Sequence, residues 1–168
     1  MDIAEDIRRI RLQEDRLQFE AFDSRTAWEV GLALKAAGEA RQAPIVVDIS
    51  LPSMPLLIFA LPGGAPENFD WVRRKGNVVY HFRRSSYAIG RRLAQEDKTL
   101  QELGALPDRD YAAHGGSFPI LLKGTGCIGA VRPAATRGSQ AGRGRARRDA
   151  RRRRRGYRAG LRRRGLPA

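Results

Sequence analysis

The chain has 168 residues, a length that suits one domain. Its formal net charge of +14 is concentrated at one end. Residues 1–131 carry 17 basic and 17 acidic side chains, whereas residues 132–168 carry the other 15 basic side chains, all of them arginine, and one acid, Asp149. The body is therefore a neutral globular domain, which excludes a basic nucleic-acid-binding domain there. The single cysteine, Cys127, excludes an intrachain disulfide and a cysteine-rich metal site.

The amino-terminal sequence MDIAEDIRRI is acidic and lacks the apolar core of a signal peptide. No apolar run approaches the length of a membrane span. We therefore expect a cytoplasmic protein with no membrane partner.

Two helices are predicted first. Isoleucines recur near the amino terminus at helical spacing with charged residues between them, which predicts an amphipathic helix. A second helix is predicted from Arg25 to Ala37, with its N-cap at Asp23-Ser24 and its end at Gly38. Its inner face is expected to carry Trp28, Leu32 and Ala36.

A β-hairpin is predicted next. The segment Ile45–Ile49 is rich in β-branched residues, and Leu56–Leu61 is a second apolar run. A proline-containing turn joins the two runs, so they are expected to pair antiparallel. A helix follows from Glu67 to about Phe82, with Pro66 suited to its first turn.

The rest of the body predicts further helices and a second hairpin. After an interruption at residues 83–86, helix resumes at Tyr87–Gln95, with a short turn at Thr99–Leu103 and a helical stretch at Pro107–Ala113. Phe118–Leu122 and Cys127–Val131 are apolar strands around a glycine-rich turn. This order of elements predicts an α+β domain with an antiparallel sheet.

The turn of the second hairpin also matches a dinucleotide-binding fingerprint, Gly124-x-Gly126-x-x-Gly129. That fingerprint requires a helix to open within it, inside a βαβ unit. Arg132-Pro133 follows too soon for such a helix, so the glycines are interpreted as a hairpin turn.

Three motifs carry a resemblance to a known family. They read WVRRKGNVV at Trp71–Val79, FRRSSYAIG at Phe82–Gly90 and DYAAHGGSFPI at Asp110–Ile120. They resemble uncharacterised protein family 0303, a branch of the haem-degrading-domain (HbpS/GlcG-like) superfamily, and the resemblance spans residues 1–131. It implies a profilin-like α/β/α sandwich, commonly assembled into homo-oligomers, whose relatives bind haem, iron or corrinoids. Residues 1–131 are accordingly expected to be a truncated domain of this type.

After Val131 the sequence departs from the family pattern, which ends in a Gly-Leu-Pro turn and a closing amphipathic helix. Shifting the reading frame by one base over Arg132–Ala150 permits, within synonymous codons, Gly-Leu-Pro-Gln-Arg-Glu-Asp-His-Lys-Leu-Val-Val-Asp-Ala-Leu-Ala-Ala-Thr. We therefore interpret residues 132–168 as a frameshift product: a disordered, arginine-rich tail in place of the closing helix. The alternative is a nucleic-acid or localisation segment, because the arginines of Arg143–Arg164 would bind phosphates non-specifically.

The best candidate site is His114 with Gly115, Gly116 and Ser117. A neutral imidazole can ligate haem iron or carry a proton, and adjacent backbone amides can hold an anion. Within the resemblance, His114 is a candidate axial ligand of haem. The alternative is a loop histidine that bonds local backbone. Two histidines and one cysteine argue against a closed zinc site.

The second candidate site is Arg83, Arg84, Ser85 and Ser86. Arginine forks suit planar oxyanions and serine hydroxyls add donors, so Arg83 and Arg84 are expected to pair with haem propionates. Alternatively, the serines cap the next helix and the arginines are solvated.

Three function classes follow. The first is a protein that binds a small ligand, with haem or another tetrapyrrole favoured. The second is an oligomeric structural or partner-binding protein without ligand chemistry, and the third is non-specific nucleic-acid binding by the tail. No nucleophile–base–orienter triad is evident, so no catalytic residue is predicted.

Overall fold

The computed structural model describes residues 2–135, which form five helices and four strands. The elements are, in order, α1 (Ile3–Arg16), α2 (Ser24–Ala40), β1 (Ile45–Leu51), β2 (Met54–Ala60), α3 (Glu67–Phe82), α4 (Ser86–Glu96), α5 (Leu100–Gly104), β3 (Phe118–Leu122) and β4 (Gly126–Ala135). The strands form one antiparallel sheet in the order β2-β1-β4-β3. Both predicted hairpins, β1–β2 and β3–β4, are confirmed.

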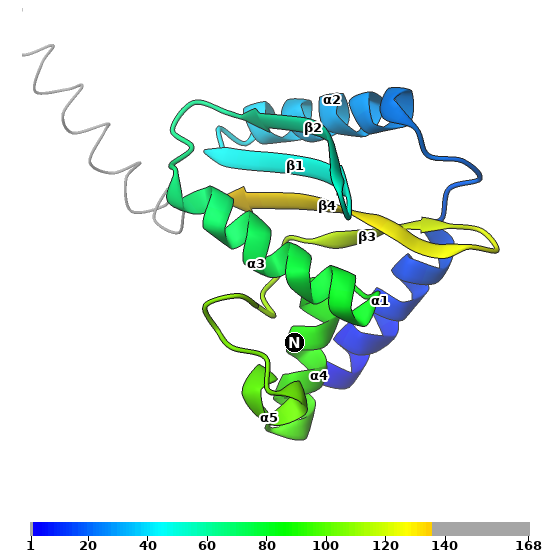
Figure 1. Ribbon diagram of the computed structural model, residues 1–168, viewed down its shortest axis with the longest axis vertical. Helices are drawn as coiled ribbons and strands as arrows, with labels where there is room; N and C mark the ends of the chain where they lie inside the picture. Colours follow the sequence, from blue (N-terminus) through cyan, green and yellow to red (C-terminus); the bar gives the residue numbers. More distant parts are fainter. Residues whose placement is uncertain (1, 136–168) are drawn as a thin grey trace, which may run out of the picture. The chain divides into compact units, whose positions relative to one another are not determined.

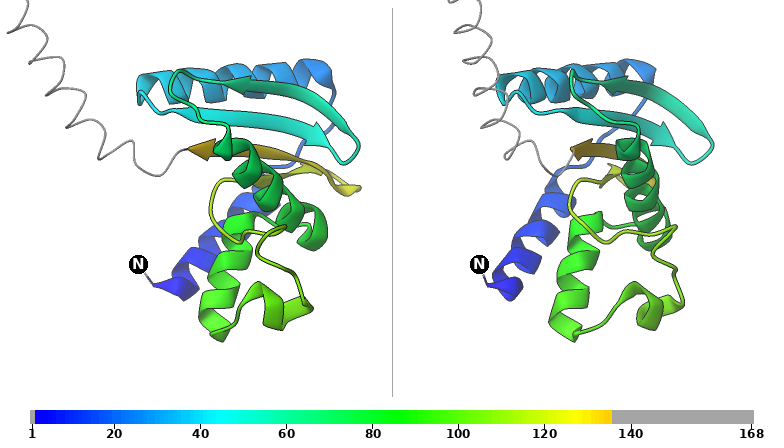
Figure 2. Two further views of the ribbon diagram at one scale, coloured as in Figure 1. Left: turned by 60° about the vertical axis from the view of Figure 1, so that its left-hand side comes forward. Right: turned by 90° about the vertical axis from the view of Figure 1, so that its left-hand side faces the viewer.

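Helices cover both faces of the sheet, with α2 on one face and α3 across the other (Figures 1 and 2). The alternation of side chains along β1 explains this arrangement. Val47 and Ile49 pack with Ala27 of α2, whereas Val46 packs with Val72 of α3. The α/β/α layering predicted for an α+β domain is therefore confirmed. No helix within residues 2–135 is long and apolar enough to cross a membrane.

The inner face of α2 differs from the predicted one. Trp28 is 57% exposed and Leu32 is 49% exposed, so neither faces the sheet. Small residues lie there instead: Ala27, Gly31 and Gly38 are buried. A Cβ on Gly31 would lie 2.0 Å from a Leu57 methyl carbon of β2, so the glycines let the helix backbone approach the sheet closely. Gly38 does not end the helix, which continues to Ala40.

The predicted helix at Pro107–Ala113 is wrong. This segment contains a single turn, in which the Asp110 and Tyr111 amides donate to the Pro107 carbonyl. Some of its other backbone groups bond to α3: the Ala112 amide donates to the Arg74 carbonyl at 3.1 Å, and the Arg109 and Asp110 carbonyls accept from side chains of that helix. Hydrogen bonds to a neighbouring helix replace those that a helix would make internally.

The predicted boundary at Val131 falls four residues too early, because Arg132–Ala135 continue β4 and pair with Ile45–Asp48 of β1. Arg132 lies opposite Asp48 and donates to its carboxylate at 2.7 Å. Both side chains are largely buried, and Arg132 also lies over the Tyr80 ring. Gly76 leaves room for it, since a Cβ there would lie 2.5 Å from the Arg132 Cδ. The remainder of the predicted tail, from residue 136, lies outside the described residues.

Candidate functional site

Two of the three motifs meet at Ser86, the first residue of α4. Its hydroxyl donates to the His114 carbonyl at 2.5 Å and accepts from the Ser117 amide at 3.1 Å. The Ser86 amide in turn donates to the Ser117 carbonyl at 3.0 Å. Ser86 and Ser117 are both buried. Ser86 thus joins the two motifs through the backbone of the 114–117 loop, and its hydroxyl is bonded to protein groups there.

Lys75 fastens the same loop from α3. The ammonium group is buried and donates to the Pro133 carbonyl at 2.9 Å and to the Gly115 carbonyl at 3.5 Å. Gly116 has φ +128°, and a Cβ there would lie 2.5 Å from the Lys75 Nζ and 2.7 Å from the Pro133 oxygen. The lack of a side chain at Gly116 therefore makes room for the Lys75 ammonium group, and not for a ligand as the sequence suggested.

The outer side of the loop presents His114, which is exposed. Its imidazole packs edge-on against the indole of Trp71, with 5.8 Å between ring centroids. The Arg74 guanidinium lies 4.6 Å from the centroid of the same indole. We call these three residues, His114, Trp71 and Arg74, the His114 surface. It combines an imidazole, an aromatic ring and a cation within a small area.

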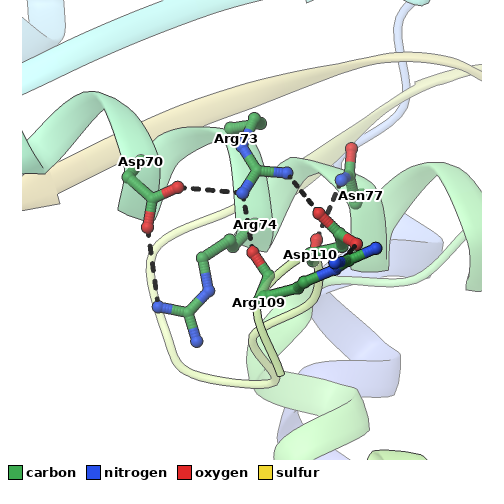
Figure 3. Close-up of polar contacts among 6 residues, drawn as sticks. All are labelled: Asp70, Arg73, Arg74, Asn77, Arg109 and Asp110. Carbon is green, nitrogen blue, oxygen red and sulfur yellow. Dashed lines mark hydrogen bonds and ion pairs between the residues drawn. The ribbon is translucent and has the colours of Figure 1, made fainter. Parts of the chain in front are cut away.

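A network of ion pairs ties the segment before the loop to α3 (Figure 3). Arg73 bridges two carboxylates, Asp70 at 2.9 Å and Asp110 at 3.0 Å, and also donates to the Arg109 carbonyl at 2.7 Å. Asn77 donates to the Asp110 carbonyl at 2.8 Å. Hydrogen bonds from Arg109 and Arg73 lower the pKa of Asp110, so its carboxylate stays charged at neutral pH. The network fixes where the chain enters the loop.

Arg74 is only weakly engaged by this network. Its guanidinium is 3.7 Å from the Asp70 carboxylate, a long ion pair. Its Nε is buried, and no acceptor for it occurs within residues 2–135. Arg74 therefore supplies the positive charge of the His114 surface, and Asp70 compensates that charge only at long range.

The two arginines predicted to hold propionates lie elsewhere. Arg83 ends α3 with φ 57° and donates to the Cys127 carbonyl of β4 at 2.9 Å. Arg84 pairs with the buried carboxylate of Glu14 in α1, which also accepts from the Ser85 amide at 2.8 Å. Arg83 lies twelve positions after Trp71, which corresponds to about 18 Å along the helix axis. The structure therefore does not bring these guanidinium groups to His114.

Ser85 follows the alternative prediction: it is the N-cap of α4, and its hydroxyl accepts from the Ala88 amide at 3.2 Å. Cys127 is half-buried, and burial raises the pKa of its thiol. Within residues 2–135 no group of three or more His, Cys, Asp or Glu side chains could hold a metal ion.

The sequence missed Trp71, Arg74 and Lys75 as parts of the site. Lys75 is not among the predicted site residues, yet it is buried in series with Asn68, Val72 and Val79. The helical spacing of these four positions could have predicted that Lys75 is buried, because the other three form an inward-facing stripe that includes its position.

Comparison with known proteins identifies the family of the chain. A family profile described as "Haem degrading protein HbpS-like" matches residues 22–140. The chain belongs to this HbpS-like family. Within it, a UPF0303 protein of Azotobacter vinelandii is 53% identical over 131 residues, which are 78% of this chain and 79% of that one. The resemblance to uncharacterised family 0303 is therefore confirmed.

Two solved structures share the fold of this HbpS-like chain. The Ybr137w protein superposes with a TM-score of 0.71 at 24% identity, over 78% of each chain. HbpS superposes with a TM-score of 0.54 at 18% identity, over 71% of this chain and 80% of that one. These identities support the shared architecture alone.

Proposed function

We propose that this protein binds a small ligand of the tetrapyrrole class, with haem favoured, on the His114 surface. The observation that carries the proposal is that the indole of Trp71 contacts both the imidazole of His114, edge-on, and the guanidinium of Arg74, which lies over the ring. Membership in a family described as haem-degrading supports the choice of ligand class.

The residues of the His114 surface fit the chemistry of haem. One imidazole suits an axial position on iron, and the indole offers an apolar face for the macrocycle. The Arg74 guanidinium, which lies over the same indole, is a cation that suits a propionate carboxylate. Arg83 and Arg84 do not fit that role, because their guanidinium groups bond Cys127 and Glu14. Bound haem would supply the redox chemistry of its iron.

The residues beneath the surface pre-organise it. Ser86 bonds the backbone of His114 and Ser117, and Lys75 donates to the Gly115 carbonyl. A loop held in this way loses less conformational freedom on binding, which favours affinity. His114 would then be presented to the ligand in its binding position.

Haem titration followed at the Soret band tests the proposal. We expect the wild-type chain to give a saturable, shifted Soret band and His114→Ala to lose it. The matched control is His81→Ala, which removes the other histidine, at the far end of α3, and should keep the wild-type band. Equal spectra for His114→Ala and His81→Ala would overturn the proposal.

A second candidate function is self-association without ligand chemistry. Trp28 and Leu32 lie one helical turn apart on the outer face of α2, and both are about half exposed. An exposed apolar pair favours a contact with another protein surface, and a homo-oligomer is the partner we propose. Sedimentation should show a smaller species for the double substitution Trp28→Gln and Leu32→Gln, but not for Lys35→Gln on the same helix.

Non-specific nucleic-acid binding by Arg143–Arg164 stays a prediction, since these residues lie outside the described part of the chain. DNA binding that survives deletion of residues 1–131 would assign it to that segment. We also retain the cytoplasm as the proposed compartment, where a free Cys127 stays reduced.

A further inference from the structure

A cleft opens between α1 and α4, away from the His114 surface of α3 and the 114–117 loop. Its volume is about 250 Å³, and its lining comprises Ile7, Arg11, Arg84, Ala88, Ile89, Arg92 and Gln95. Three arginines therefore border a floor that Ile7, Ala88 and Ile89 make apolar.

All three arginines have donors to spare. The Nε of Arg84 is bound to Glu14, and the Nε of Arg92 donates to Glu96 at 2.7 Å. Among residues 2–135, no acceptor is bonded to the terminal nitrogens of Arg84 or Arg92, and Arg11 has no acidic partner. The two glutamates thus orient guanidinium groups whose remaining N–H donors are available to a ligand.

Glu14 gives this arrangement its rigidity. Its side chain is 5% exposed, and its second oxygen accepts from the Ser85 amide. A carboxylate fixed on both oxygens holds Arg84 in one orientation, which lowers the entropy cost of binding through that arginine. Arg84 is therefore a pre-organised part of the cleft wall.

We propose that this cleft binds a compact organic anion, in which a carboxylate or phosphate group meets the arginines and a small apolar body covers the floor. Guanidinium forks suit both kinds of oxyanion. The volume lies below the 300–1,000 Å³ typical of pockets for drug-sized ligands. A tetrapyrrole is too large for it, so this site is independent of the proposed haem surface.

The test must separate the cleft from the 15 arginines of residues 132–168, which attract anions themselves. Isoleucine-methyl NMR of the full chain provides this separation, because Ile7 and Ile89 line the cleft and Ile58 lies on β2. The probes are benzoate, phenyl phosphate and inorganic phosphate. We expect saturable shifts at Ile7 and Ile89, but not at Ile58, with at least one of the two aromatic probes.

Arg11→Gln and Arg92→Gln should each weaken that binding about tenfold, or about 1.4 kcal/mol. The matched control is Arg8→Gln, which removes an exposed arginine of α1 outside the cleft and should change affinity less than about twofold. Comparing benzoate with phenyl phosphate identifies the preferred oxyanion. Equal weakening by all three variants, shifts that do not saturate, or inorganic phosphate binding as tightly as phenyl phosphate would overturn the proposal.

Discussion

Buried polar side chains hold the 114–117 loop in place. Ser86 and Lys75 reach it from α4 and α3, and they donate to the backbone carbonyls of His114 and Gly115. Such bonds fix the path of the chain whatever the loop side chains are. The loop is therefore a structural unit, and His114 lies on its exposed side.

Replacing Ser86 with alanine should lower the free energy of unfolding by about 1–3 kcal/mol, since it leaves the buried Ser117 amide without its acceptor. Urea denaturation measures this change, with Ser24→Ala, an exposed serine at the start of α2, as the control. Amide exchange at Ser117 should accelerate in Ser86→Ala. An unchanged midpoint would show that the hydroxyl does not fasten the loop.

The Asp48–Arg132 pair is a second buried polar contact, between the two central strands. Asp48→Asn should cost roughly 3 kcal/mol, because it leaves the arginine cation buried without its counter-charge. Replacing both residues, Asp48→Leu with Arg132→Met, should restore most of the loss. Asp70→Asn, which breaks exposed pairs, should cost at most about 1 kcal/mol. Thermal or urea unfolding that ranks these variants differently would contradict this assignment.

The roles of single residues were the hardest feature to predict from the sequence. Serine at the start of a helix satisfies a capping preference, as Ser85 does, and the next serine looks equivalent. Only the fold shows that Ser86 bonds a loop 28 residues away. Contacts of this range depend on tertiary packing, which local preference cannot reveal.

At the scale of elements, the sequence predicted the helices and strands well because each has a clear period or cap. The helix α3 has the predicted bounds, and the β3–β4 hairpin has the predicted pairing. The predicted buried face of α2 is wrong because its largest apolar residues point outward. Close packing on the sheet, made with glycine and alanine, determined the buried face instead.

Gly38→Ala tests this packing. A Cβ there would lie 2.6 Å from a Leu61 methyl carbon and 2.8 Å from one of Ile45, so overpacking of about 1–3 kcal/mol should outweigh the gain in helix propensity. Gly104→Ala, whose nearest neighbour would be 3.7 Å away, should be neutral or slightly stabilising. Stabilisation by both substitutions would mean that α2 does not pack closely on the sheet.

At the scale of the whole molecule, the α3 face of the sheet is incompletely covered. Ile58 of the edge strand β2 lies opposite Asp48, and Asp48 points to Arg132 beneath α3. Paired residues project to the same face, so Ile58 belongs to the α3 face, yet it is 47% exposed. This edge of the sheet therefore exposes an apolar side chain, and the loss of the family's closing helix stays a prediction, because residues 136–168 lie outside the described part of the chain.

Restoring the reading frame beyond Ala135, which keeps β4 and its Asp48–Arg132 pair, should stabilise the protein. A helix that buries several hundred Å² of apolar surface, at about 25 cal/mol per Å², contributes on the order of 10 kcal/mol. We expect the frame-restored chain to melt at a higher temperature and to be more soluble. Equal melting temperatures, together with protease resistance of residues 136–168 in the present chain, would contradict the frameshift interpretation.

We propose that His114, held on the 114–117 loop, serves as an axial ligand of haem. The most direct test is the spectrum of the haem complex of His114→Gly with and without added imidazole. We predict that the wild-type Soret and visible bands are lost in this variant and return when imidazole fills the vacated space. A His114→Gly complex that already has the wild-type spectrum without imidazole would contradict the claim.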